Sequence, residues 1–210
     1  MNYPITPTVF KNNPFEWDWV EKDFFHSADG SKEFPNHHCK QTWVKSYPYI
    51  KGKRNAVDVG CRDGEYSRYL HTTFEHVYCF DYRRRKLFHK NVDVSKITHF
   101  KCGLGETQKK ELVSGGGSMT TGKIPKDKWY YENIHTLDEF KLTNIDYIKI
   151  DVDGYETKVL QGAINTINKY NPLLVIEQEG KDTEAIDFCK EIGYNIVEWD
   201  DAHRNVIMEK

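Results

Sequence analysis

A carboxylate lies where a buried strand is expected to carry only apolar side chains. The segment AVDVGCRDGEYS, residues 56 to 67, has the character of a buried strand that runs into a glycine turn, yet Asp58 lies inside the strand. An unpaired carboxylate there would cost several kcal/mol, so Asp58 must have a hydrogen-bonding partner. Because the Asp58 carboxylate lies just before the turn, it would face a cationic or amine-bearing ligand better than a pyrophosphate. The alternative is that Asp58 only caps a neighbouring turn.

Two further acids follow predicted strands. Asp151 ends the apolar segment IDYIKID, and Glu177 ends the segment PLLVIE. If these strands are neighbours in a parallel sheet, both carboxylates lie in the crevice beyond its carboxyl edge. There they could act as a general base toward a hydroxyl group, or hold a divalent cation that acidifies it. The residues do not decide whether a metal ion takes part. The alternative to both catalytic roles is that Asp151 is purely structural.

The glycine turn allows two interpretations as a dinucleotide-type site. Gly60 lets the chain leave the strand tightly, and Gly64 lets the next helix pack closely and a ligand approach the backbone. The NAD fingerprint is G-x-G-x-x-G, but Cys61 stands where its middle glycine would be. Asp81 follows Gly60 by 21 residues (81 − 60), a spacing that suits a ribose diol in either case. Cys61 and the acid at position 58 therefore disfavour an NAD-linked oxidoreductase.

The elements that must position these residues alternate from Asn55 onward. Strands are predicted over 55–59, 76–80, 98–102, 145–151, 172–177, 194–199 and 204–209, and helices over 65–74, 84–90, 155–170 and 182–193. Asp153 and Glu156 have the spacing of a capping box for the third helix. The alternation predicts an α/β fold with a mostly parallel twisted sheet and helices on both faces. The closely spaced last two strands predict an antiparallel edge.

The domain organisation follows from where this alternation begins and where it is interrupted. Residues 1–54 are predicted to form an N-terminal cap or arm, which includes a helix that begins near Asn36 and stops before Pro48. Residues 55–210 are predicted to form the main domain, with an insertion loop or hairpin at about 106–140. Whether the N-terminal segment closes over a substrate stays open.

Composition limits the classes of partner. The chain of 210 residues has 30 Lys plus Arg and 32 Asp plus Glu, a net charge of −2, which gives no attraction to nucleic acid or anionic membrane. No apolar run approaches the ~18 residues of a membrane span, and the first residues do not resemble a secretory signal. Five cysteines without CxxC spacing are typical of a reducing compartment. We therefore expect a cytoplasmic protein without a nucleic-acid partner; its oligomeric state stays open.

Several segments are similar, in order, to one known family. VDVGCRDGEYS is similar to motif I of class I S-adenosylmethionine-dependent methyltransferases, and IDYIKIDVDGYETKVLQGA (145–163) resembles the strand-to-helix unit of the FkbM-type family among them. The supporting segments are VYCFDYRR (77–84), FKCGLGE (100–106), the glycine-serine loop with Ser118, IHTLDEF (134–140), PLLVIEQEG (172–180) and GYNIVEW near the end. The resemblance covers roughly residues 55–210. The chain departs from the family pattern at Arg62, where the family has Asn, and at Asp81-Tyr82, where it has Glu-Pro.

The resemblance implies a Rossmann-like class I methyltransferase fold with S-adenosyl-L-methionine as cofactor. It implies that Asp58 holds the amino-acid moiety of the cofactor, that Gly60, Cys61 and Gly64 allow backbone approach, that Asp81 binds the ribose hydroxyls, and that Tyr82 with Cys102, Gly103 and Leu104 borders the adenine. It also places Asp151 and Glu177 at the reacting centre.

The function that this resemblance implies is methylation of a hydroxyl oxygen on a sugar, glycan or small-molecule acceptor. A nucleic-acid methyltransferase is disfavoured by the charge and by the absence of an Asn/Asp-Pro-Pro-Tyr or Pro-Cys motif. The remaining alternative is a non-catalytic binding module that kept the fold. Loss of Asp58 or Asp81 would have favoured that alternative, and both are present.

Overall fold

The computed structural model describes residues 5, 7, 25–26, 32–33, 38–83, 87–114, 129–178, 183–200 and 204–210. Most of the predicted N-terminal cap, the glycine-serine loop with Ser118 and part of the helix predicted over 84–90 lie outside the described residues. Among the described residues, Phe25–His26 (β1) and Lys32–Glu33 (β2) form a short antiparallel pair.

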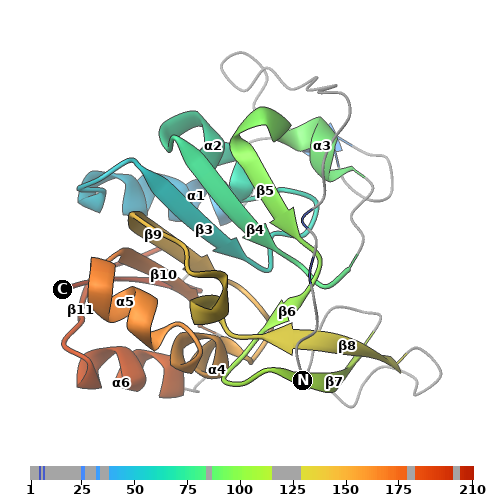
Figure 1. Cartoon of the computed structure of the whole chain (residues 1–210). Helices are drawn as coiled ribbons and strands as arrows, with labels where there is room; N and C mark the ends of the chain where they lie inside the picture. Colours follow the sequence, from blue (N-terminus) through green and yellow to red (C-terminus); the bar gives the residue numbers. More distant parts are fainter. Residues whose placement is uncertain are drawn as a thin grey trace.

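A seven-stranded sheet forms the centre of the molecule, in the order β11-β12-β10-β9-β3-β4-β5 (Figure 1). Its strands are β3 Asn55–Val59, β4 His76–Phe80, β5 Ile97–Phe100, β9 Ile145–Ile150, β10 Leu173–Glu177, β11 Asn195–Trp199 and β12 Asn205–Glu209. The strands from β10 to β5 pair in parallel. Strand β12 runs antiparallel to both β10 and β11, so the predicted terminal hairpin is confirmed.

Helices cover both faces of the sheet, as predicted (Figure 1). One face carries α1 His38–Ser46, α2 Ser67–Thr73 and α3 Phe88–Asn91; the other carries α4 Glu156–Gln161, α5 Ile164–Tyr170 and α6 Glu184–Glu191. Because side chains alternate along a strand, Val57 and Val59 of β3 pack in the core under α4–α6, whereas Ala56 packs in the core under α1–α3. Asp58 therefore points toward α1 and α2.

Helix α1 is tied to the sheet by buried polar contacts as well as by Trp43. The Thr42 hydroxyl donates to Asp200 Oδ2 at 2.9 Å, and Ser46 Oγ lies 2.8 Å from the Tyr147 hydroxyl of β9. The helix ends at Ser46, and a 3-10 turn, Tyr47–Tyr49, continues the chain through Pro48. The predicted helix is confirmed over its described part.

The helix predicted over 155–170 is divided, because α4 ends before Gly162 and α5 begins at Ile164. A Cβ atom on Gly162 would lie 1.9 Å from the carbonyl oxygen of Gly105, and the Gly162 carbonyl accepts the N–H of Asp138. This close approach of two loops interrupts the helix. The sequence signals only the glycine and not the neighbour that approaches it.

The predicted capping box of α4 is wrong. Tyr155 occupies the N-cap position without a side-chain hydrogen bond, and Asp153 takes a left-handed conformation with φ 55°. The Glu156 carboxylate instead accepts the backbone N–H groups of Val152 and Gly154 at 3.1 and 3.2 Å. Asp153 thus belongs to the loop between β9 and α4.

A second sheet, in the order β6-β8-β7, includes two strands of the predicted insertion and one strand just before it. Its strands are β6 Gly103–Leu104, β7 Lys109–Ser114 and β8 Trp129–His135, and β7 and β8 pair antiparallel. After β8, Thr136 and Glu139 form a capping box for the 3-10 helix Leu137–Phe140. A further 3-10 helix, Val94–Lys96, precedes β5.

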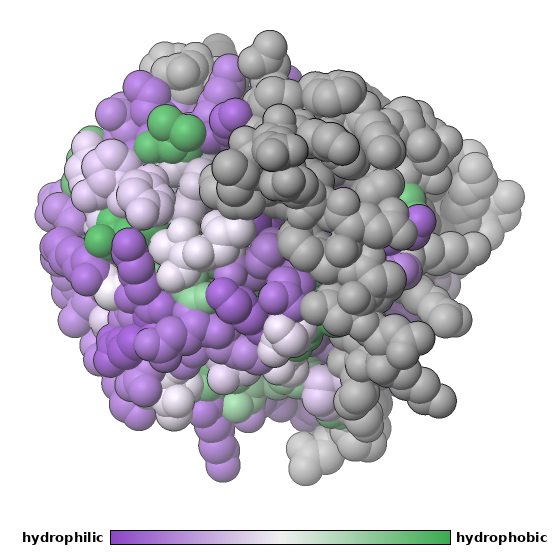
Figure 2. Space-filling model, turned by 90° about the horizontal axis from the view of Figure 1, so that it is seen from above, coloured by the Kyte–Doolittle hydropathy of each residue, from purple (hydrophilic) through white to green (hydrophobic). Residues whose placement is uncertain are grey.

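Figure 2 shows one face of the molecule, seen from above. The part of this face that described residues form is largely hydrophilic, with hydrophobic residues scattered across it. Among the described residues, no helix has the length and apolarity required to cross a membrane.

Candidate active site

The two halves of the sheet meet at β3, which is the topological switch point. From β3 the chain continues to β4 and β5 on one side. It then crosses back to β9, which pairs with β3 on the other side. The turn after β3 is fixed to both neighbours, because Gly60 N donates to Phe80 O at 2.9 Å and Asp151 N donates to Val59 O at 3.0 Å. In open parallel sheets, the crevice beyond this point is where ligands bind.

The two glycines of the turn cannot carry side chains. Gly60 has φ +82°, and a Cβ atom there would lie 1.8 Å from the carbonyl oxygen of Asp151. Gly64 has φ +88°, and its Cβ atom would lie 3.0 Å from Val92. The predicted need for glycine at both positions is therefore explained by the backbone conformation and by close packing.

Asp58 has a partner inside the protein. Its side chain is 1% exposed, and Ser67 Oγ at the start of α2 donates to Asp58 Oδ2 at 2.5 Å. Burial raises the pKa of Asp58 to about 7, which the Ser67 hydrogen bond and the charge of Lys149 only partly offset. This answers how the fold accommodates a carboxylate in the strand; contact between Asp58 and a cofactor stays a prediction.

Asp81 links the glycine turn to the turn after β4. Its Oδ2 accepts the N–H of Arg62 at 3.1 Å, and its Oδ1 accepts the N–H of Arg83 at 2.7 Å. Arg62 takes a left-handed conformation with φ 47°. Asp81 thus holds the backbone of both turns at the edge of the crevice, and its contact with a ribose stays a prediction.

The residues predicted to border an adenine fall into two groups. Tyr82 is 8% exposed and follows β4, with the Arg83 guanidinium 5.6 Å and the Tyr130 ring 6.4 Å from its ring centroid. Cys102, Gly103 and Leu104 are buried where the chain passes from β5 into β6. Cys61 is buried too, and burial raises the pKa of its thiol well above the usual range.

The two acids predicted at the reacting centre do come together, and a third joins them. One carboxylate oxygen each of Asp151, Asp153 and Glu177 lie within 4.8 Å of one another. Burial, and then the charge of Asp151, raises the pKa of Glu177 above its usual range. Sequence reasoning missed Asp153, because the D-x-x-E spacing assigns it to a cap that does not form.

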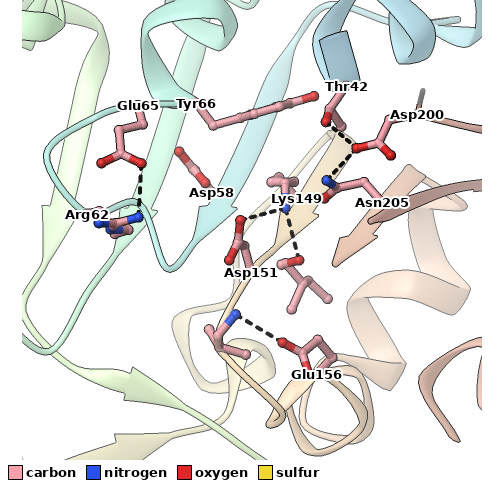
Figure 3. Close-up of polar contacts among 12 residues, drawn as sticks. Thr42, Asp58, Arg62, Glu65, Tyr66, Lys149, Asp151, Glu156, Asp200 and Asn205 are labelled. Carbon is pink, nitrogen blue, oxygen red and sulfur yellow. Dashed lines mark hydrogen bonds and ion pairs between the residues drawn. The ribbon is translucent and has the colours of Figure 1, made fainter. Parts of the chain in front are cut away.

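Sequence reasoning also missed Lys149, a buried cation beside this cluster. The side chain is 2% exposed, and its Nζ lies 3.2 Å from both Asp151 Oδ2 and the carbonyl oxygen of Ile150 (Figure 3). Burial alone would lower the pKa of Lys149, but the charges of Asp151 and Glu177 raise it. A charged residue inside IDYIKID is the same signal that marked Asp58, and could have identified Lys149.

A small polar cavity adjoins Glu177. It has a volume of about 100 Å³ and lies between the start of α4 and the start of α6. Its walls include Tyr155, Glu156, Lys158, Gln178 and Glu184. At the opposite rim of the site, Arg62 pairs with Glu65 at 3.3 Å (Figure 3).

Residues 58–199, more than half of the chain, match the family model of the methyltransferase FkbM domain. The chain belongs to the FkbM methyltransferase family. The resemblance seen in the sequence motifs is thereby confirmed. The strand order, with one antiparallel strand next to the edge of a parallel sheet, is that of class I methyltransferases.

The chain is similar to several solved structures. The methyltransferase FkbM from Methylobacillus flagellatus KT superimposes with a TM-score of 0.58 and 19% sequence identity, covering 81% of this chain and 48% of that one. The chain thus spans about half the length of that protein. Precorrin-8w decarboxylase from Methanobacterium thermoautotrophicum has a TM-score of 0.49 and 16% identity, over 90% of this chain and 96% of that one. Precorrin-6y C5,15-methyltransferase from Geobacter metallireducens GS-15 has a TM-score of 0.48 and 8% identity, over 90% and 93%. No curated protein has a significant sequence match to the chain.

Proposed function

We propose that this protein transfers the methyl group of S-adenosyl-L-methionine to a hydroxyl oxygen of a sugar, glycan-linked or small-molecule acceptor. Membership of the FkbM methyltransferase family supports methyl transfer. The observation that carries the proposal is the position of Asp151: its backbone closes the glycine turn, and its carboxylate lies beside Glu177. A group that touches both the turn and the acid cluster can face cofactor and acceptor at once.

The cofactor would lie across the carboxyl edge of β3 and β4. In this arrangement the glycine turn admits the amino-acid moiety near Asp58, and Asp81 receives the ribose hydroxyls. Tyr82 supplies an aromatic face for the adenine. The sulfonium would then point toward Asp151, which is the direction that transfer to the acceptor requires.

The reaction is an in-line displacement, in which the acceptor oxygen forms a bond to the methyl carbon as the carbon–sulfur bond breaks. S-adenosylhomocysteine leaves as a neutral thioether. The hydroxyl proton becomes strongly acidic as the oxygen gains its third bond, and the Asp151 carboxylate takes it. The raised pKa of Glu177 favours a proton on that carboxyl group over one on Asp151, so we assign the role of base to Asp151 and the donation of a hydrogen bond to Glu177.

A divalent cation is the alternative way to activate the hydroxyl group. Asp151, Asp153 and Glu177 offer carboxylate oxygens, the ligand type that Mg²⁺ and Ca²⁺ prefer. The two mechanisms differ in one measurable respect, because only the cation mechanism loses activity when a chelator is added.

The test is a screen of acceptors with cofactor labelled on the methyl group, using neutral sugars, uronic acids, amines and oligonucleotides. We expect methyl ethers of neutral hydroxyl compounds as products. Asp151→Asn should lower the turnover by about 100-fold or more while leaving cofactor affinity unchanged. Asp187→Asn is the matched control, because Asp187 is exposed on α6 and should change nothing.

Two results would overturn the proposal. One is a product methylated on nitrogen or carbon with no methyl ether formed. The other is an Asp151→Asn variant that transfers methyl groups to a hydroxyl as fast as the unmodified protein.

A further inference from the structure

A buried ammonium group lies among the carboxylates of the site. In the central sheet, Lys149 of β9 stands in register with Asp58 of β3 on one side and Val175 of β10 on the other. Glu177 follows Val175 by two residues and so projects from the same face. Asp58 and Lys149 therefore lie side by side on one face of the sheet, and Asp151 and Glu177 lie two residues further along the chain from Lys149 and Val175 (Figure 3 shows Asp58, Lys149 and Asp151).

This charge is costly for the fold. Lys149 is 2% exposed, and taking an ammonium group out of water carries a penalty of several kcal/mol before pairing. Contacts at 3.2 Å to Asp151 Oδ2 and to Ile150 O offset that penalty. An apolar side chain of similar length would fill the position without any penalty, so packing alone does not account for the lysine.

The ammonium group has a geometric consequence for the acid cluster. It engages Asp151 on Oδ2, which fixes the orientation of that carboxylate relative to the crevice. It also places a full positive charge beside three carboxylates whose oxygens lie within 4.8 Å of one another. A divalent cation bound to the same oxygens would be repelled by this neighbour.

We propose that Lys149 is a positioning residue that orients Asp151 and supplies the positive charge of the cluster in place of a divalent cation. The inference rests on the proposed function, because Asp151 is the group whose orientation matters for methyl transfer. The acid cluster of this protein is then complete without metal.

The test is a Mn²⁺ titration, followed by electron paramagnetic resonance, of the full chain and of Lys149→Met, with Lys149→Arg as the control that retains the charge. The unmodified protein and Lys149→Arg should bind no Mn²⁺ at about 1 mM, whereas Lys149→Met should bind at least about tenfold more tightly. Adding Asp153→Asn to Lys149→Met should remove the gained binding. In the activity assay, Lys149→Met should lose turnover at unchanged cofactor affinity, and Mn²⁺ should restore part of it.

Two outcomes would overturn the inference. One is Mn²⁺ binding by the unmodified protein that Asp153→Asn abolishes, a result that decides the matter even if Lys149→Met does not fold. The other is a folded Lys149→Met protein with no gain in Mn²⁺ affinity. Cofactor titration of the same samples separates the two proposals: absence of cofactor binding contradicts the methyltransferase function, whereas the Mn²⁺ result bears on Lys149 alone.

Discussion

At the level of single residues, the buried carboxyl of Asp58 makes stability depend on pH. Burial raises its pKa to about 7 in the folded protein, above the value of an unfolded chain. Between these two pKa values the folded state binds more protons than the unfolded state. Asp58 therefore contributes stability that is fully present below about pH 4 and is lost as the pH rises through about 7.

Asp58→Asn should remove this dependence, because an amide is neutral and can still accept the hydrogen bond of Ser67. We expect the free energy of unfolding of the variant, relative to the unmodified protein, to rise by on the order of 2 kcal/mol from pH 5 to pH 8. Urea denaturation at the two pH values measures it, with the exposed Asp187→Asn as control. If the free energy of unfolding changed equally with pH in Asp58→Asn and in the unmodified protein, that result would contradict the assigned pKa.

The sequence reveals a site residue when the neighbouring residues alone mark it as unusual. Asp58, Asp151 and Glu177 are recognisable as acids in or just after apolar strands. Asp153 is not, because its spacing to Glu156 mimics a capping box, and only the left-handed turn shows where its carboxylate goes. Lys149 carries a local signal too, a charge inside the apolar segment IDYIKID, but its place beside Asp151 and Glu177 depends on the pairing of β9 with β3 and β10, which local sequence does not display.

At the level of elements, the break between α4 and α5 depends on Gly162. Its φ of −76° permits alanine in the backbone, so the obstacle is the carbonyl oxygen of Gly105, which would lie 1.9 Å from an added Cβ atom. Gly162→Ala should destabilise the protein by about 2–4 kcal/mol, because the loop or the helices must shift. Gln161→Ala, at an exposed neighbouring position, should change the free energy of unfolding by less than about 0.5 kcal/mol. Equal effects of the two substitutions in urea denaturation would show that the contact is unimportant.

The docking of α1 depends on the Thr42 hydroxyl. It donates to Asp200, a buried carboxylate that also accepts from Asn205 Nδ2 at 2.8 Å and from the N–H of Arg204 (Figure 3). Thr42→Val should cost about 1–3 kcal/mol of stability, because it leaves part of a buried carboxylate without its donor. Val44→Ala, on the exposed side of the same helix, serves as the comparison, with an expected change within about 0.5 kcal/mol. Thermal unfolding that does not distinguish the two variants would argue against this link.

The elements themselves are predictable to different degrees. Strands β3 and β4 begin and end where the apolar pattern predicts, because buried parallel strands are short apolar runs bounded by turns. The sequence over 155–170 predicts a single helix, because its apolar face continues across Gly162. The carbonyl group that interrupts it comes from residue 105, far away in the sequence.

At the level of the whole molecule, the alternation of strands and helices is enough to predict a parallel sheet with two helical layers. The order of the strands, with β12 inserted between β10 and β11, depends on long-range pairing that periodicity does not contain. That order matters for function, because it places the switch point at β3 and brings Asp58, Asp81 and Asp151 to one edge. The class I methyltransferase fold was predicted from the family resemblance, because local pattern does not contain the strand order.

The most direct test of this arrangement is a calorimetric titration with S-adenosyl-L-methionine and S-adenosylhomocysteine, with NAD as the control ligand. We expect about micromolar binding of both sulfur ligands and none of NAD. Asp81→Ala should weaken binding by about tenfold or more, because it removes a charged hydrogen-bond acceptor, whereas Asp187→Ala should not. Absence of binding by the folded protein, or equal binding by the Asp81→Ala variant, would contradict the assignment of this crevice as the cofactor site.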